Sequence, residues 1–303
     1  MKTISFIATL IILGYISVAQ VPSCCSQPGA CQSVTDPLWT NDINDNGFNL
    51  SYFVGHSSGY LQLPNEYGDT VYTKRSIIQQ ALTTSFWFSL NSNLLIITRL
   101  PLRYIKNSAD DVYGIGDATI GFFYNPSKLL KLKEEHDFNL QMNLSVPSGR
   151  SYNLDTALMY KSLLQTGSGN FNADIGIRYQ HNVQQHVIMA MLTARQSMYQ
   201  LHNYKNASLY TAQLGYTYRQ KTSANTELAY QFNVLGERYL KDYVNGDIAY
   251  NSGYSMFMLV PRLRLQHDLC QFNVQAYLPV YRQFQGRQLK LNYIFVSGFT
   301  YVF

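Results

Sequence analysis

The C-terminal end of this chain alternates residue by residue between two kinds of side chain, up to the last residue, Phe303. One set is nearly all aromatic or apolar: Leu291, Tyr293, Phe295, Ser297, Phe299, Tyr301 and Phe303. The residues between them form the other set: Asn292, Ile294, Val296, Gly298, Thr300 and Val302. A period of two over this length predicts one β-strand with two different faces. One face of that strand needs an apolar environment.

Similar alternating segments, each of the length that a tilted strand needs to cross a membrane, recur along the chain. The predicted strands are 47–56, 80–91, 93–105, 115–125, 135–147, 170–181, 185–196, 207–219, 224–235, 254–266, 269–281 and 290–303. The clearest is 135–147, where Phe138 and Leu140 alternate with Asn139 and Gln141. The segment 185–196 is ambiguous, because its centre is apolar on both faces.

The connections between these strands alternate between short and long. Short or moderate links alternate with longer ones, and the longest are 57–79, 148–169 and 236–253. Outer-membrane barrels have short periplasmic turns and longer external loops, and bacterial ones have an even number of strands. The pattern therefore predicts a 12-stranded antiparallel transmembrane β-barrel over 47–303, with both termini periplasmic. A soluble all-β protein is the alternative, but it does not need this parity.

The N-terminus carries the features of a secretion signal. Lys2 precedes an apolar run from Ile4 to Ile16, and Ser17-Val18-Ala19 supplies small residues before a cut at Gln20. A lipoprotein cut before Cys24 is the alternative. We therefore expect a signal peptide over 1–19 and a periplasmic segment over 20–46. No later stretch is apolar for long enough to form a transmembrane helix.

The composition agrees with a barrel that has a wet lumen. Only 14% of the residues are charged, whereas tyrosine occurs 25 times. Uncharged polar residues and many tyrosines are typical of a polar interior and aromatic girdles. The net charge of +5 is modest, and the sequence contains no run of Lys or Arg residues. Both observations argue against nucleic acid as a partner.

Directing the apolar face outward leaves a set of charged side chains for the lumen. These lumen candidates are Arg99, Arg103, Asp117, Asp137, Asp174, Arg178, Arg219, Glu227, Arg262 and Arg264. The set mixes both signs with a slight positive excess. It is either a selectivity lining for a polar or weakly anionic solute, or a paired network that fills a small barrel. A barrel of this size lies between filled and open ones, so strand number does not decide.

Catalysis is a rival class, because some 12-stranded outer-membrane barrels are phospholipases with a Ser/His/Asn set. The six histidines lie at predicted strand ends or in connections: His56, His136, His181, His186, His202 and His267. None of them forms a nucleophile–base pair that the sequence alone reveals. We therefore expect no enzyme.

Four cysteines fall on one side of the predicted barrel. Cys24, Cys25 and Cys31 precede the first strand, and Cys270 lies at the turn between 254–266 and 269–281. Disulfides persist in the periplasm, so these cysteines could pin the N-terminal segment to the barrel. The alternative is a soft-metal site for copper(I) at the N-terminal cluster, which lumen-facing Met256 and Met258 could extend. Otherwise we expect no cofactor.

Several segments together resemble a family of outer-membrane barrels labelled "MetA-pathway of phenol degradation". They are YGIGDATIGFFY at 113–124, NLSVPSGR at 143–150, LLQTGSGNFNADIGIRY at 163–179 and LPVYRQFQGRQL at 278–289. The resemblance covers about the C-terminal two thirds of the chain. It implies an outer-membrane barrel that passes small or hydrophobic compounds, and it supplies no catalytic residues.

These observations lead to two functional hypotheses for a protein of the Gram-negative outer membrane. The first is a passive channel or transporter for small polar or hydrophobic solutes, with the long loops as its lid. The second is a non-conducting scaffold or accessory subunit that docks a partner or metal through its cysteine segment. Expected partners are outer-membrane lipid, lipopolysaccharide and the barrel assembly machinery, which would read Tyr301 and Phe303 as an assembly signal.

Overall fold

A computed structural model describes residues 46–64, 70–107, 111–127, 129–151, 165–249, 252–285 and 288–303. In this part of the chain all regular structure is β, and no helix is long and apolar enough to cross a membrane. The predicted signal peptide, nearly all of the segment 20–46, and Cys24, Cys25 and Cys31 lie outside the described residues.

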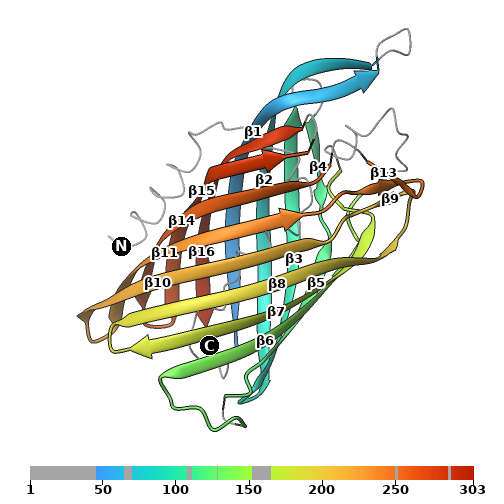
Figure 1. The fold of residues 1–303 in the computed structure, drawn as a ribbon. Coiled ribbons are helices and arrows are strands. Elements are labelled where there is room, and N and C mark those ends of the chain that lie inside the picture. Colours follow the sequence, from blue (N-terminus) through green and yellow to red (C-terminus); the bar gives the residue numbers. More distant parts are fainter. Residues whose placement is uncertain are drawn as a thin grey trace.

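The strands form one closed, antiparallel, twelve-stranded barrel, in which β4 and β5 count as one interrupted strand (Figure 1). Its strands are β1 (Gly47–Pro64), β2 (Thr70–Asn91), β3 (Leu94–Asn107), β4 (Asp111–Ile115), β5 (Ala118–Tyr124), β6 (His136–Val146), β7 (Asn170–Val183), β8 (His186–Gln200), β10 (Leu209–Ser223), β11 (Thr226–Tyr239), β14 (Tyr254–His267), β15 (Cys270–Phe284) and β16 (Leu289–Val302). Three short strands form a separate sheet: β9 (Tyr204–Lys205), β12 (Tyr243–Val244) and β13 (Asp247–Ile248). The predicted fold and strand order are confirmed.

Strands β4 and β5 are two parts of one interrupted barrel strand, because both pair with β3. The interruption falls at Gly116 and Asp117, where the Gly116 amide donates to the Pro101 carbonyl at 2.7 Å. A Cβ on Gly116 would meet the side chains of Arg103 and Pro101 within 2.8 Å, so the chain approaches β3 too closely for any other residue.

The barrel closes between its first and last strands. Gly47 pairs with Val302 and Leu50 with Phe299, and the Phe303 amide donates to the Asn46 carbonyl at 2.9 Å. The ring of Phe48 lies 6.0–6.3 Å from the rings of Phe86, Phe299 and Tyr301. The aromatic face of the terminal strand therefore forms the outer surface of the seam.

The alternation within each strand separates an apolar outer wall from a largely polar lumen. Ile175, Leu192 and Phe295 are more than half exposed, whereas the lumen neighbours Asp174, Thr193 and Val296 are buried. An exposed apolar band around a closed barrel is the surface that a bilayer core requires. The barrel is thus built to lie in a membrane, as the sequence predicts.

Two predictions about the end of the barrel with the longer connections, here called the long-loop end, are wrong. The alternation predicts Leu291 on the aromatic face, but this residue lies buried in the lumen. A β-bulge inserts Asn292 between the pairs His56–Tyr293 and Ser57–Leu291. The segment 57–79 is not mainly a loop. β1 and β2 stay paired as far as Pro64 and Thr70, and their hairpin projects beyond the barrel (Figure 1).

Candidate functional site

The lumen is the candidate site, since the charged side chains of the barrel wall converge there. Seven of the predicted candidates are buried: Arg99, Arg103, Asp117, Asp174, Arg178, Arg262 and Arg264. Asp137, Arg219 and Glu227 are half-buried and lie on the same face of their strands. That these residues set selectivity stays a prediction.

The arginines concentrate in the half of the lumen near the short turns. Arg99, Arg178 and Arg262 each lie five residues from the short-turn ends of their strands, which are Leu94, Val183 and His267. Arg219 and Arg264 lie slightly nearer to that end. We call these five residues the arginine band. It draws on β3, β7, β10 and β14, so it surrounds the lumen rather than lining one wall.

Three ion pairs tie part of this charge to the wall. Arg195 meets Asp174 through two parallel hydrogen bonds, one of them from Nη2 to Oδ2 at 2.8 Å. The second pair joins Arg264 Nη2 to Glu227 Oε1 at 2.7 Å. In the third, Arg178 Nη2 lies 4.0 Å from Asp137 Oδ2. Paired groups of this kind support the network interpretation for one part of the lumen.

Asp117 accepts hydrogen bonds from two backbone amides. Its Oδ2 accepts the Ser168 amide at 2.7 Å, and its Oδ1 accepts the Gly149 amide at 3.1 Å. Both partners flank the connection between β6 and β7, so this carboxylate links the two described ends of that connection at the long-loop end. Both oxygens of the Asp117 carboxylate are therefore hydrogen-bonded to backbone amides.

The other half of the lumen is apolar over several neighbouring strands. The cluster comprises Ala207, Leu209, Leu235, Tyr239, Tyr254, Met256, Met258, Val260, Tyr277, Leu291, Ile294 and Val296. We call it the lumen apolar patch. On β14 the same face changes from Met256, Met258 and Val260 to Arg262 and Arg264. One strand therefore presents an apolar surface and then a basic surface to the same interior.

Side chains fill part of the lumen at the level of the arginine band. A cavity of about 10 Å³ remains between Gln180, Thr217, Arg219 and Arg264. That is about the space of one water molecule. The interior is therefore narrow at this level. Elsewhere on the lumen face, the buried amides of Gln213 and Gln271 contain side-chain atoms that find no partner among the described residues. Such groups require water or another polar molecule.

A buried carboxylate ties the small outer sheet to the mouth of the barrel. Asp242 accepts hydrogen bonds from the Ala207 amide at 2.8 Å and from the hydroxyls of Tyr239 and Tyr204. Burial raises the pKa of Asp242 to about 6, and the three donors act in the opposite direction. We call these four residues the Asp242 cluster.

The sequence did not reveal one serine–histidine contact. His202 Nε2 lies 3.1 Å from Ser151 Oγ at the long-loop end, and Gly169 packs against both. Within the described residues, His202 has no carboxylate or amide partner for its other ring nitrogen. The contact joins Ser151, which follows β6, to His202, which follows β8.

Cys270 is the one cysteine among the described residues, and it is a half-buried free thiol. It pairs in register with His267 at the turn between β14 and β15. No group of three metal-ligating side chains occurs in the described ranges. The disulfide and copper(I) hypotheses thus stay predictions, as most of their residues fall outside those ranges.

The sequence also missed Arg195 and Glu237. Arg195 lies in the segment 185–196, whose orientation the sequence leaves ambiguous, and Glu237 lies in β11 instead of in the predicted connection 236–253. The continued alternation Thr193, Arg195, Ser197 is the signal that marks Arg195 as a lumen residue.

The fold of this chain is similar to those of solved outer-membrane barrels, one of which is a channel. The COG4313 outer membrane channel from Pseudomonas putida F1 is 14% identical, with 86% of this chain and 96% of that chain covered and a TM-score of 0.66. The translocator domain of the autotransporter NalP from Neisseria meningitidis is 12% identical over 90% and 93% of the two chains, with a TM-score of 0.48. No protein-family model and no curated protein matches the chain.

The likeness to the COG4313 channel establishes the fold of an outer-membrane β-barrel.

Proposed function

We propose that this barrel is a passive channel or transporter for small solutes that combine an anionic group with an apolar body. The observation that carries the proposal is the lumen face of β14, where Met256, Met258 and Val260 are followed by Arg262 and Arg264. Contact with the first three residues buries the apolar body and is favourable. A carboxylate or phosphate is stabilised by charge-assisted hydrogen bonds from the guanidinium groups.

We further propose that the long-loop end faces the outside of the cell and that both termini lie in the periplasm. Short turns on one side and longer loops on the other are the usual arrangement in bacterial barrels. A solute then meets the lumen apolar patch first and the arginine band second. The similarity to a channel fold and the sequence resemblance to the "MetA-pathway of phenol degradation" family support this proposal, and membership of that family is part of it.

Single-channel recording in planar bilayers tests the function. With a salt gradient across the bilayer, we expect measurable conductance and a reversal potential that indicates anion preference. The variant Arg262→Ala/Arg264→Ala should shift the reversal potential toward cation preference, because two positive charges leave the lumen. Lys290→Gln on the outer wall is the matched control and should leave the reversal potential unchanged.

The scaffold hypothesis predicts a different result. Folded protein that conducts neither as the native chain nor as Arg262→Ala/Arg264→Ala would refute the channel. Specific capture of a periplasmic partner that is lost on Cys24→Ser/Cys25→Ser would then favour the accessory role. Heat-modified migration on gels establishes in each case that the barrel is folded.

A further inference from the structure

A groove of about 1040 Å³ crosses the outer wall close to the long-loop end. Its floor follows one line across the sheet, because Leu192 pairs with Ala212, Ala212 with Gly236, and Gly236 with Phe257. The small residues Ala212 and Gly236 form the low part between the larger side chains. The groove is therefore a recess in the surface that contacts lipid.

A second line of residues borders this floor on its long-loop side, and it is polar. Tyr210 pairs with Arg238, Arg238 with Ser255, and Ser255 with Gln283. On each strand the polar residue lies two positions nearer to the long-loop end than its apolar partner on the floor, about 7 Å along the strand. The two lines reproduce the order of headgroup and acyl chain in a lipid.

Arg238 is the charged group of the polar line, and it is exposed on the outer wall. Its Nη1 donates to Ser255 Oγ, which orients the guanidinium along the rim of the groove. No carboxylate contacts Arg238 among the described residues. An arginine on the lipid face of a barrel is costly near the midplane and tolerated close to the headgroups, where it meets anionic lipid.

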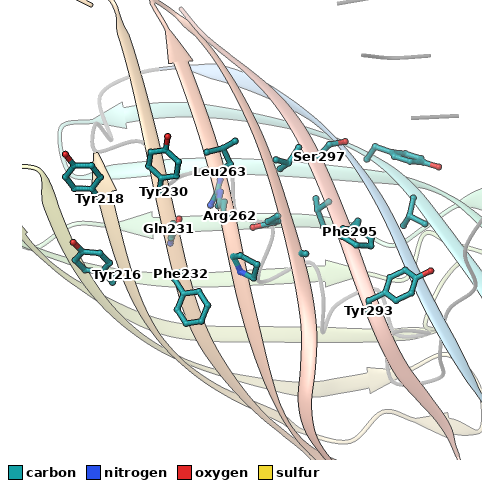
Figure 2. Close-up of a pocket in the computed structure, with 17 residues that line it drawn as sticks. Tyr216, Tyr218, Tyr230, Gln231, Phe232, Arg262, Leu263, Tyr293, Phe295 and Ser297 are labelled. Carbon is teal, nitrogen blue, oxygen red and sulfur yellow. The ribbon is translucent and has the colours of Figure 1, made fainter. Parts of the chain in front are cut away.

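A comparable groove elsewhere on the outer wall lacks this polar line. It has a volume of about 730 Å³ and lies between aromatic residues of β10, β11 and β16 (Figure 2). Ala276 lies in it, and its one charged lining residue, Arg262, is buried toward the lumen. This second groove provides a control that matches the first in apolar character but has no outward-facing charge.

We propose that the groove beside Arg238 is a binding site for a phosphorylated lipid of the outer leaflet, namely the lipid A portion of lipopolysaccharide. The guanidinium of Arg238 and the hydroxyl of Tyr210 bind a phosphate of the headgroup. One acyl chain lies over Ala212 and Gly236 against the ring of Phe257. The site uses the proposed orientation of the barrel, but it does not depend on conduction through the lumen.

Native mass spectrometry of the folded protein in detergent, titrated with diphosphorylated lipid A, tests the site. Arg238→Gln should weaken binding about tenfold, since it removes a charge-assisted hydrogen bond. Ala212→Leu should weaken it by a similar factor by filling the groove. Both substitutions lie on the outer wall, and neither inserts a charge into the lipid face, so the barrel should still fold.

Two matched controls separate this site from general adsorption. Lys290→Gln removes one positive charge near the same end of the barrel, and Ala276→Leu fills the second groove. Both should retain native affinity for lipid A. Equal losses in the controls and in the groove variants would refute the site.

Two further outcomes also refute the proposal. Phosphatidylglycerol that binds as tightly as lipid A, with the same response to Arg238→Gln, would show that any anionic lipid suffices. A dimer of the protein that disappears in Ala212→Leu, with no bound lipid, would show that a second copy of the chain covers the groove. Loss of lipid binding with normal conductance would leave the channel function intact.

Discussion

The pair Asp174–Arg195 gives the sharpest test of how the lumen is built. The two residues face each other across β7 and β8, and both side chains are 7% exposed. Removing one partner of a buried ion pair leaves an uncompensated charge, which typically costs about 3–5 kcal/mol. We therefore expect Arg195→Met to lower the free energy of unfolding by that amount.

Two comparisons make this prediction specific. His267 Nε2 and Asp268 Oδ2 lie 3.5 Å apart, and their side chains are 65% and 54% exposed, so Asp268→Asn should cost less than about 1 kcal/mol. The double variant Asp174→Asn/Arg195→Met should recover part of the loss, because it removes the buried charge. A double-mutant cycle then gives a coupling energy of about 1–3 kcal/mol for the pair.

Urea unfolding of the barrel in lipid vesicles measures these differences, with tryptophan fluorescence as the signal. Trp87 is almost fully buried in the lumen, so its emission reports on loss of the barrel interior. A loss below about 1 kcal/mol for Arg195→Met would refute the reasoning. It would mean that water solvates Asp174 as well as the arginine does, and that the lumen is open at this level.

Three further predictions concern the mouth, the seam and the wall. First, burial holds the pKa of Asp242 at about 6 instead of 3.8, so the protonated carboxyl contributes about 3 kcal/mol to the stability of the folded state at low pH. That contribution is lost as the pH rises through about 6. Proteolysis within 240–249 should therefore be slower at about pH 5 than at about pH 8, and Asp242→Asn should remove that difference. Second, deletion of Phe303 should reduce assembly into the membrane of cells, while the variant Phe303→Tyr, which keeps an aromatic end, should assemble normally when membrane fractions are compared. Third, a Cβ on Gly121 would lie within 2.5 Å of Asn143 and Ile97, so Gly121→Val should destabilise the barrel by about 1–3 kcal/mol in urea unfolding, and an unchanged midpoint would contradict that packing.

The strands of this barrel were predictable because their signal is local. Residues i and i+2 on one strand face the same medium, and the contrast between lipid and lumen is large. The assignment failed at Leu291, where the single extra residue Asn292 exchanges the two faces. It also failed at 57–79, because a hairpin that projects beyond the membrane need not alternate between lipid and lumen. A bulge and an extra-membranous hairpin both break the rule on which the prediction depends.

The site was less predictable than the fold, since its contacts join distant strands. The sequence identified Asp174 as a lumen residue, but only the register of β7 against β8 brings Arg195 to it. Tyr204 and Ala207 approach Asp242 because β9 pairs with β12 in a separate small sheet, and Tyr239 reaches it from the end of β11. No spacing along the chain encodes such contacts, and each of them alters what a charged residue can do.

The order of surfaces along β14 links this construction to transport. Charge alone in a narrow lumen would attract hydrophilic anions such as chloride or phosphate, and such ions gain nothing from Met256, Met258 or Val260. A lumen lined by apolar residues alone would exclude ions, because water leaves an apolar constriction and ions do not enter it without their hydration shells. A solute that favours both surfaces must present an apolar body and a negative group at a separation that matches the step from Val260 to Arg262. Competition measurements should therefore show that aromatic carboxylates block chloride conductance more strongly than acetate does, and that Met258→Ser weakens the aromatic block while leaving the effect of acetate unchanged.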